Sequence, residues 1–113
     1  MWRIEYYTEP NGRQPVAEWL DKFNKRIRNF ILDKIDLLGL HGLALLNTNM
    51  MRPLKGYERK FYEIKYSNYR IVLYHDTARQ VFVLLHGFKK ERQRELKEIK
   101  TAYSRLRKYF SRQ

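Results

Sequence analysis

The middle of the chain reads YEIKYSNYRIVLYH, from residue 62 to residue 75. Aromatic and β-branched residues dominate this stretch, and such residues suit the pleated, half-buried surface of a β-strand. Only Ser67 and Asn68 interrupt the run, and Asn tolerates the positive φ that a two-residue hairpin turn requires. The stretch therefore predicts two antiparallel strands, residues 62–66 and 69–75, joined by a tight turn.

The predicted turn also fixes the register of the hairpin, because Tyr66 then lies opposite Tyr69 and Lys65 lies opposite Arg70. Alternation along each strand sorts the side chains into two faces. The face that we expect to be the core side holds Tyr62, Ile64, Tyr66, Tyr69, Ile71 and Leu73. The face that we expect to be open holds Phe61, Glu63, Lys65, Arg70, Val72 and Tyr74.

Lys65 and Arg70 would thus be direct neighbours across the hairpin, where like charges are destabilising. One explanation is that both side chains lie near an open hairpin end and extend into water, where their repulsion is weak. The other explanation is that an anion such as a phosphate group binds between them. The sequence leaves both explanations open.

The chain has 113 residues, which we interpret as one domain, residues 1–113, with one core. It has no cysteine, so neither a disulfide framework nor thiolate chemistry is available to it. No apolar run reaches membrane-spanning length, and the first residues lack the apolar core of a signal peptide. We therefore expect a cytoplasmic protein that does not insert into a membrane.

The charge balance points to a polyanionic partner. Lys and Arg number 24 against 12 Asp and Glu, which gives a net charge of +12. On so small a domain this excess predicts binding to nucleic acid or to an acidic protein. Aromatic residues make up 15% of the chain and favour RNA over duplex DNA only weakly, because most of them should be in the core.

The first part of the chain reads as one strand followed by two helices. Residues 2–7 alternate between two sets of side chains as an edge strand does. Pro15 is placed to open a short helix at its first position. A second helix is expected from about residue 25 to residue 38, with its end at Gly39 or Gly42.

The segment before the hairpin has a poorly defined pattern. Residues 40–52 are expected to form a loop whose leucines pack under the domain. Pro53 has no N–H group to donate to a ladder, so the next strand should begin after it. Lys55-Gly56 reads as a tight turn that brings the Lys55 side chain close to the hairpin.

The last part of the chain predicts a central strand and a basic helix. Residues 81–85 are continuously apolar, which is typical of a strand buried on both faces. After residue 90 the period is that of a helix, with Arg94 and Glu98 spaced as an ion pair. Its expected apolar stripe consists of Leu96, Ile99, Tyr103, Leu106 and Phe110. Residues 89–113 hold ten Lys or Arg against three Glu, so this helix presents either a solvated surface or one that attracts phosphates.

The chemistry available to the chain is narrow. His41, His75 and His86 lack the spacing of metal ligands, and we interpret His86 as structural or as a supporting member of a site. No phosphate-binding glycine loop, dinucleotide motif or Ser or Cys nucleophile motif is present, and we expect no metal and no other cofactor. Lys, Arg, Tyr and Glu remain. They suit cleavage of RNA by its own 2′-hydroxyl, which needs a base, a proton donor and cations around the phosphate.

The order of strand, two helices, three strands and final helix resembles the RelE/ParE superfamily of toxins from type II toxin–antitoxin systems. Several short motifs resemble its phage-derived, HigB-like branch: LKG at 54–56, YEIK at 62–65, YRI at 69–71, HGFKK at 86–90, and Glu98-Ile99 followed by Ala102. The resemblance implies a RelE-like α+β fold. In that fold a small antiparallel sheet, in the chain order β-α-α-β-β-β-α, packs against two N-terminal helices and a basic C-terminal helix.

RelE-like members cleave mRNA in the ribosomal A site, so the resemblance implies a ribosome-dependent endoribonuclease. By position, Lys65 is the candidate base or phosphate ligand, Arg70 would hold the scissile phosphate, and Lys90 would aid the leaving 5′-oxygen. Glu63 stands where RelE has a second lysine, and it would share the role of the base or orient Lys65. Leu96 stands where RelE has a tyrosine. Supporting RNA and phosphate contacts are expected from Lys55, Lys89, Arg92 and Arg94.

The resemblance also implies a cognate helix-turn-helix antitoxin as a partner, together with mRNA and the ribosome. Two alternatives remain open. ParE-like relatives share the fold but inhibit DNA gyrase by protein–protein contact. A non-catalytic RNA- or ribosome-binding module would carry the same charge, and single substitutions of its basic residues would weaken binding gradually rather than abolish an activity.

Overall fold

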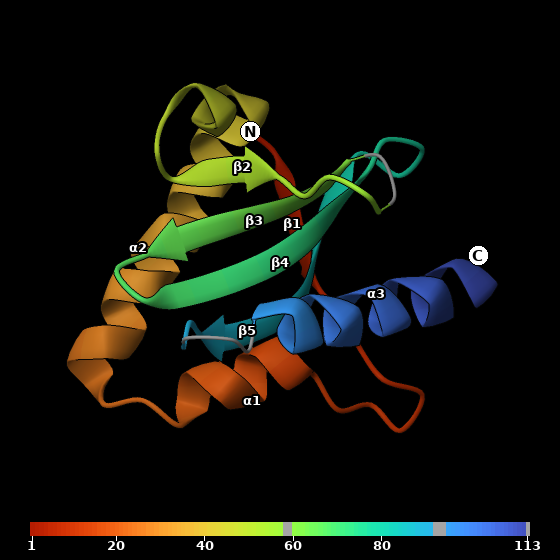
Figure 1. The fold of residues 1–113 in the computed structure, drawn as a ribbon, viewed down its shortest axis with the longest axis horizontal. Coiled ribbons are helices and arrows are strands. Elements are labelled where there is room, and N and C mark those ends of the chain that lie inside the picture. Colours follow the sequence, from red (N-terminus) through yellow and green to blue (C-terminus); the bar gives the residue numbers. More distant parts are fainter. Residues whose placement is uncertain (58–59, 92–94, 113) are drawn as a thin grey trace.

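The computed structural model describes residues 1–57, 60–91 and 95–112. The elements in chain order are β1 (Arg3–Tyr6), α1 (Pro15–Asp21), α2 (Lys25–His41), the 3-10 helix η1 (Gly42–Asn47), β2 (Met51–Pro53), β3 (Phe61–Tyr66), β4 (Tyr69–Asp76), β5 (Val81–Lys89) and α3 (Glu95–Ser111). The strands form one sheet in the order β1-β5-β4-β3-β2, with α1 and α2 on one face and α3 on the other (Figure 1). This arrangement confirms the predicted α+β fold class.

The sheet differs from the prediction at both of its edges. β1 is an edge strand, as expected, but it runs parallel to β5, so the sheet is mixed rather than wholly antiparallel. At the other edge the structure adds β2, which begins in the segment 40–52 that was expected to be a loop and ends at Pro53. Pro53 ends β2 instead of preceding a strand. An edge strand tolerates this proline because its missing N–H group leaves no neighbour unpaired.

The helices before the sheet begin and end close to the predicted residues. Pro15 is the first residue of α1, where its missing N–H group costs nothing. Asn24 caps α2, and its side chain accepts a hydrogen bond from the backbone N–H of Ile27. Of the two glycines that could end this helix, Gly42 does so, with φ of 53°.

The central hairpin has the predicted register. Tyr66 pairs with Tyr69, Lys65 with Arg70 and Ile64 with Ile71. The positive φ of the two-residue turn falls on Ser67, at 53°, and not on Asn68, where the prediction had placed it. The alternation of the two strands was thus sufficient to predict which residues face each other.

The helices α1 and α2 cover the face of the hairpin that was expected to be the core side. Ile64, Ile71 and Leu73 are buried there against Val16 and Leu20 of α1 and residues of α2. The residues of α2 that are buried in this layer are Ile31, Ile35 and Leu38.

The other face of the hairpin is not open, which corrects the prediction. The helix α3 packs across it, so Phe61 and Val72 are buried together with Val83 and Leu85 of β5. Glu63 and Arg70, which alternate onto the same face, are 1% and 9% exposed. Only part of this face, near the hairpin turn, remains accessible at Lys65.

The stripe of α3 that packs on the sheet is rotated relative to the predicted one. Its buried residues are Ile99, Ala102, Leu106 and Tyr109. Leu96 and Phe110, which were expected in the stripe, are 59% and 39% exposed. The small Ala102 lets the helix approach the sheet closely, and a pattern of apolar letters alone gave the larger Tyr103 and Phe110 too much weight.

The strand β5 contains one extra residue beside β4. Val72 lies opposite His86 whereas Leu73 lies opposite Leu84, so Leu85 has no partner in the ladder. Because of this bulge, Leu85 and His86 both face α3, although they are consecutive. None of the helices in the described residues is long and apolar enough to cross a membrane.

Candidate functional site

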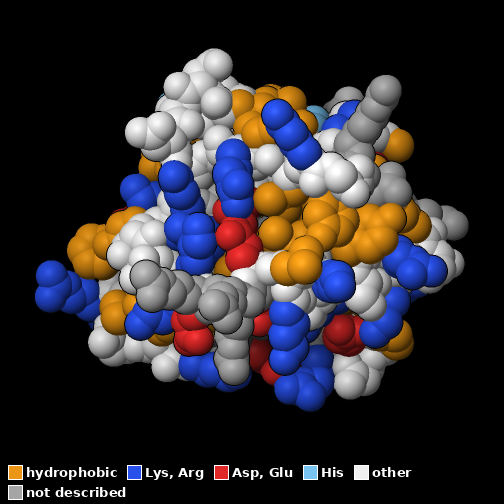
Figure 2. All heavy atoms as spheres, in the orientation of Figure 1, with side chains coloured by type: hydrophobic (Ala, Val, Ile, Leu, Met, Phe, Trp, Pro, Cys, Tyr) orange, Lys and Arg blue, Asp and Glu red, His pale blue; other side chains and the backbone are white. Residues whose placement is uncertain are grey.

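Five charged residues meet on the α3 side of the sheet: Arg52, Glu63, Arg70, Lys90 and Glu95. We call this group the Glu63 cluster. Arg52 links its two carboxylates, since Nε donates to Glu63 Oε1 at 2.9 Å and Nη2 donates to Glu95 Oε1 at 2.7 Å. Arg70 Nε lies 3.7 Å from Glu63 Oε1, and Lys90 Nζ lies 3.5 Å from Glu95 Oε2. Figure 2 shows carboxylates between Lys and Arg side chains in the middle of this face.

The edge strand β2 brings Arg52 to the cluster. The pairing of β2 with β3 places Arg52 directly opposite Glu63, where an opposite-charge pair is stabilising. The sequence prediction missed Arg52 because the segment was expected to be a loop. Three residues that end in a proline carry too little periodic signal to reveal this short edge strand from the sequence.

Glu63 is the most deeply buried member of the cluster. Its Oε2 atom has no hydrogen-bond donor among the described residues. Burial raises the pKa of the Glu63 carboxyl, and Arg52 only partly offsets this effect. For Glu95, burial is outweighed by a hydrogen bond with Glu63 and by the charges of Lys90 and Arg52, so the pKa of Glu95 is lowered. Glu63 is therefore the carboxyl that takes up a proton first, and it can then donate a hydrogen bond to Glu95.

Arg70 is held by the hairpin turn rather than extended into solvent. Its Nη1 atom donates to the carbonyl oxygens of Ser67 at 2.7 Å and Tyr69 at 3.0 Å. The expectation that Arg70 lies on an open face is wrong, because this side chain is buried between the turn and Glu63. It closes the turn and neutralises a buried carboxylate at the same time.

The three lysines Lys65, Lys89 and Lys90 lie around the turn of the hairpin and are exposed. Lys89 pairs with Tyr69 at the end of β5, and the backbone N–H of Lys90 donates to Asn68 O at 2.6 Å. Lys65 forms no ion pair with any residue that the structure describes. The structure thus brings these three predicted residues to one place.

Of the remaining predicted residues, Lys55 does not join this site. Lys55 follows β2 beside Phe61, at the opposite end of β3 from Lys65. Four residues of strand separate the two ends, or about 13 Å. Arg92 and Arg94 lie outside the described residues, and so does the expected pair of Arg94 with Glu98.

Glu98 binds His86. His86 Nε2 lies 2.7 Å from Glu98 Oε2, and Arg105 Nη1 donates to His86 Nδ1 at 2.8 Å. Because Nδ1 accepts, the ring is neutral and its Nε2–H donates to Glu98. Burial lowers the pKa of His86, a hydrogen bond to Glu98 opposes this effect, and Arg105 adds to it. This geometry fits the structural interpretation of His86.

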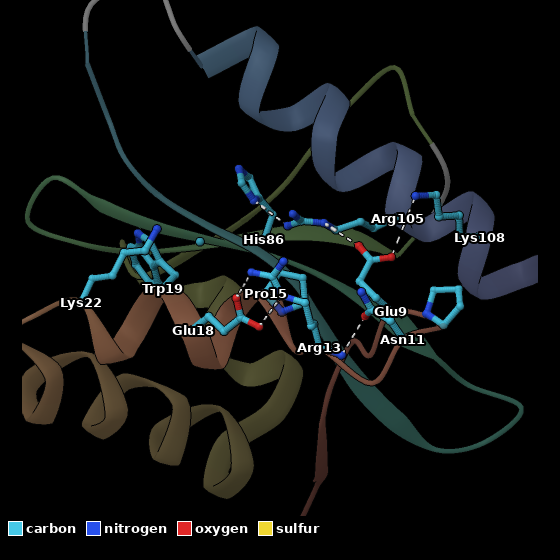
Figure 3. A pocket seen from close by; sticks show the side chains of 12 residues that line it. Glu9, Asn11, Arg13, Pro15, Glu18, Trp19, Lys22, His86, Arg105 and Lys108 are labelled. Carbon is cyan, nitrogen blue, oxygen red and sulfur yellow. Dashed lines mark hydrogen bonds and ion pairs between the residues drawn. The ribbon is translucent and has the colours of Figure 1, made fainter.

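His86 also lines a groove of about 700 Å³ between the loop after β1, α1 and α3 (Figure 3). Most charges in this groove are already paired. Arg13 forms a bidentate ion pair with Glu18, with hydrogen bonds of 3.0 and 2.6 Å, and Glu9 lies 3.7 Å from Arg105. The groove therefore offers less free positive charge than the hairpin turn does.

The fold is that of a small α+β protein of the RelE type, and the exposed Lys65, Lys89 and Lys90 lie around its hairpin turn. A chain in the crystal structure of the toxin–antitoxin complex RelBE2 from Mycobacterium tuberculosis has the same fold, with a TM-score of 0.52 and 13% sequence identity. The match covers 79% of this chain and 98% of that chain. No curated protein sequence matches the chain.

The family is identified by sequence. The profile described as "Phage derived protein Gp49-like (DUF891)" matches residues 18–107, so the chain belongs to the Gp49-like family. The family confirms the predicted phage-derived branch, and the RelBE2 chain confirms the predicted RelE-like fold.

Proposed function

We propose that this protein is the toxin of a type II toxin–antitoxin pair and that it cleaves translated mRNA on the ribosome. The observation that carries this proposal is the group of exposed lysines around the hairpin turn, directly beside a buried carboxyl with a raised pKa. A net charge of +12 supports an RNA partner. The RelE-type fold supports the assignment to translated mRNA.

The reaction that fits these residues is attack of the RNA 2′-oxygen on the adjacent phosphorus. A P–O bond to the 2′-oxygen forms, the P–O bond to the 5′-oxygen breaks, and one proton moves from the attacking to the leaving oxygen by way of the protein. Lys65 is the candidate base or phosphate ligand, and Lys90 is the candidate donor to the leaving oxygen. The half-exposed Arg52 stabilises the charge on the phosphate.

Glu63 acts in this proposal through its neighbours. Since it is 1% exposed, it does not reach an RNA strand on the surface. It holds Arg52 on one side and Arg70 on the other, and its burial raises the pKa of its own carboxyl. The sequence left two roles open for Glu63, a share in the role of the base and orientation of Lys65. Its burial argues against the first, and the cations that it holds are Arg52 and Arg70 rather than Lys65.

The proposed partner is a small antitoxin with a helix-turn-helix DNA-binding part. A toxin with free cations around its site needs an acidic or tightly fitting partner to prevent contact with RNA in the cell. The solved RelBE2 structure is a toxin–antitoxin complex, which supports a partner of this kind.

The test is primer extension on a defined mRNA in a cell-free translation mixture, with and without ribosomes. The wild type, the Lys65→Ala/Lys90→Ala variant and the control Lys55→Ala are compared, since Lys55 is an exposed lysine outside the site. We expect discrete cuts that need ribosomes, that vanish in the double variant and that persist in the control. Growth arrest without any cut would support a gyrase inhibitor, and cuts without ribosomes would indicate a free ribonuclease.

A further inference from the structure

A second basic surface lies where α1 meets α2. Between residues 22 and 34 the chain has five cations and a single carboxylate, Asp33. The cations are Lys22, Lys25, Arg26, Arg28 and Lys34, and none of them forms an ion pair in the described part of the chain. On α3, in contrast, Arg105 and Lys108 share one carboxylate, because they lie 3.7 and 3.9 Å from Glu9. Free positive charge is therefore also present around the start of α2, whereas the sequence had directed attention to α3.

Three aromatic rings are stacked beside these cations, and we call them the ring stack: Phe30, Tyr66 and Tyr69. The ring centroids of Phe30 and Tyr66 are 5.7 Å apart at an interplanar angle of 26°. Those of Tyr66 and Tyr69 are 6.3 Å apart at 15°. Phe30 is 41% exposed at the end of the stack. The nearly parallel row of rings ends at the partly exposed Phe30, and a flat group that stacks there displaces the Arg26 guanidinium, which lies over this ring.

The cations lie directly against this row. The guanidinium of Arg26 is 5.8 Å from the centroid of the Phe30 ring, and Lys34 Nζ is 5.4 Å from that of Tyr66. Planar rings flanked by flexible cations are what single-stranded RNA requires, since its bases stack on the rings while its phosphates bind the cations. Figure 2 shows hydrophobic and basic side chains side by side at the hairpin end of the molecule.

The ring stack adjoins the candidate site through the hairpin turn. Tyr66 follows Lys65 along β3, and Tyr69 precedes Arg70 along β4. Alternation puts the rings on the α2 side of the sheet and Lys65 on the α3 side. Only the two exposed turn residues, Ser67 and Asn68, separate the two surfaces. An RNA strand bound at Lys65 can therefore continue around the turn onto the ring stack.

We propose that the ring stack and its cations bind the segment of single-stranded RNA that flanks the cleaved bond. One base stacks on Phe30, and Arg26 and Lys34 bind the neighbouring phosphates. This inference rests on the proposed function for the nature of the substrate. It adds a binding surface on α2 that lies on the opposite side of the sheet from the Glu63 cluster.

The stacking contribution is measured by fluorescence anisotropy with a short labelled single-stranded RNA in the absence of ribosomes. Loss of one base–aromatic stack weakens binding about five-fold or more. We expect Phe30→Leu to show this loss, Phe30→Trp to bind at least as well as the wild type, and the control Phe110→Leu to bind unchanged. Phe110 is a comparably exposed aromatic residue on α3. Equal binding by Phe30→Leu and the wild type would overturn the proposal.

The phosphate contacts are measured by the salt dependence of the same binding. For single-stranded nucleic acid, each lost phosphate contact lowers the slope of log K against log salt by about 0.7. We expect this change for Arg26→Ala and for Lys34→Ala, and no change for Lys108→Ala, whose charge is paired with Glu9. Unchanged slopes in the first two variants would contradict the proposal.

The binding assay separates this proposal from the proposed function. RNA cleavage on ribosomes together with Phe30-independent RNA binding would leave the nuclease in place and exclude the ring stack as a binding surface. RNA binding that depends on Phe30, from a protein that makes no cuts, would retain the ring stack and exclude the nuclease.

Discussion

Lys65 and Arg70 face each other across one rung of the hairpin, but they have different roles. The Arg70 guanidinium is buried, caps two carbonyl groups of the turn and pairs with Glu63. Lys65 is exposed and has no ion pair among the described residues. Two like charges are tolerated at opposite positions of the hairpin because the Glu63 carboxylate neutralises one of them, Arg70. The explanation in which both charges extend freely into water does not hold for Arg70.

The first prediction concerns this pair of residues. Arg70→Ala removes the donor for two turn carbonyls and one of the cations beside a buried carboxylate, so it should lower the free energy of unfolding by about 1–3 kcal/mol. Lys65→Ala, on the same rung, should change it by less than about 0.5 kcal/mol. Urea denaturation of both variants provides the measurement. Equal stability of the two variants would show that the Arg70 contacts contribute little.

A second prediction concerns His86 and pH. The unfolded ring binds a proton near pH 6.5, whereas burial lowers the pKa of the folded ring. Below that pH the unfolded state binds more protons, so the stability from His86 is present above about pH 6.5 and decreases as the pH falls. The slope is at most about 1.4 kcal/mol per pH unit.

The variant His86→Gln isolates this effect, because burial also lowers the pKa of His75, and that residue titrates in both proteins. Stability measured from pH 7.5 downward should decrease more steeply for the wild type than for the variant. Parallel curves would mean that Glu98 keeps the folded ring as basic as the unfolded one.

At the scale of elements, β5 and α1 depend on a close contact between Gly87 and Trp19. A Cβ atom added to Gly87 would lie 2.2 Å from the Trp19 ring. The indole covers Gly87 at the end of β5 and also contacts Phe23 and Tyr69. This glycine thus sets the distance between the first helix and the central strand.

The third prediction follows from that contact. Gly87→Ala should destabilise the protein by about 1–3 kcal/mol, because α1 must shift away from β5. Gly39→Ala is the matched control, since its added Cβ would meet only ordinary contacts at 3.7 Å and longer. Within α2, where Gly39 lies in the last turn, this change should be neutral or stabilise by up to about 1 kcal/mol. Thermal unfolding distinguishes the two, and similar melting temperatures would contradict the assigned role of Gly87.

The sequence could predict elements whose pattern is determined locally. The hairpin register follows from strict alternation around a two-residue turn, and Pro15 marks the start of α1. The strand β2 could not be predicted with the same ease, because three residues ending in a proline carry almost no periodic signal. Arg52 was missed for this reason, although it makes the shortest contacts in the Glu63 cluster.

The sequence also could not predict whether a face of the sheet is exposed or covered by a helix. Whether the face is covered depends on which of two adjacent stripes of α3 packs on the sheet, and both stripes contain apolar residues. Ala102 and Tyr109 decide the matter, one because it is small and the other because its hydroxyl has partners in the interior. Such choices are made by packing between distant segments.

At the scale of the whole molecule, one network ties the first strand to the last helix. Arg79, in the turn after β4, donates to both carboxylate oxygens of Glu5 at 3.1 and 2.8 Å and to the Tyr109 hydroxyl at 2.6 Å. The same hydroxyl donates to Asp76 at 2.6 Å. Burial and the hydrogen bond to Asp76 raise the pKa of Tyr109 to about 12, so the hydroxyl remains a donor at any physiological pH.

The fourth prediction tests this network. Tyr109→Phe keeps the buried ring but removes the hydroxyl from between Arg79 and Asp76, so it should cost about 1–3 kcal/mol of stability. Tyr57→Phe is the control, because its ring packs on Phe61 and Tyr103 and its hydroxyl forms no hydrogen bond with the residues that the structure describes. Its stability should stay within about 0.5 kcal/mol of the wild type. Denaturant unfolding of both variants gives the comparison, and an equally stable Tyr109→Phe would make the network dispensable.

The parallel pairing of β1 with β5 has a consequence for how the protein is made. Arg3 pairs with Val81, so β1, the first strand to leave a translating ribosome, can pair only after β5 has also been synthesised. The Glu63 cluster likewise remains incomplete until Lys90 and Glu95 have emerged. Long-range pairing of this kind delays closure of the fold to the end of synthesis. The candidate site is therefore assembled only after residues from both halves of the chain have left the ribosome.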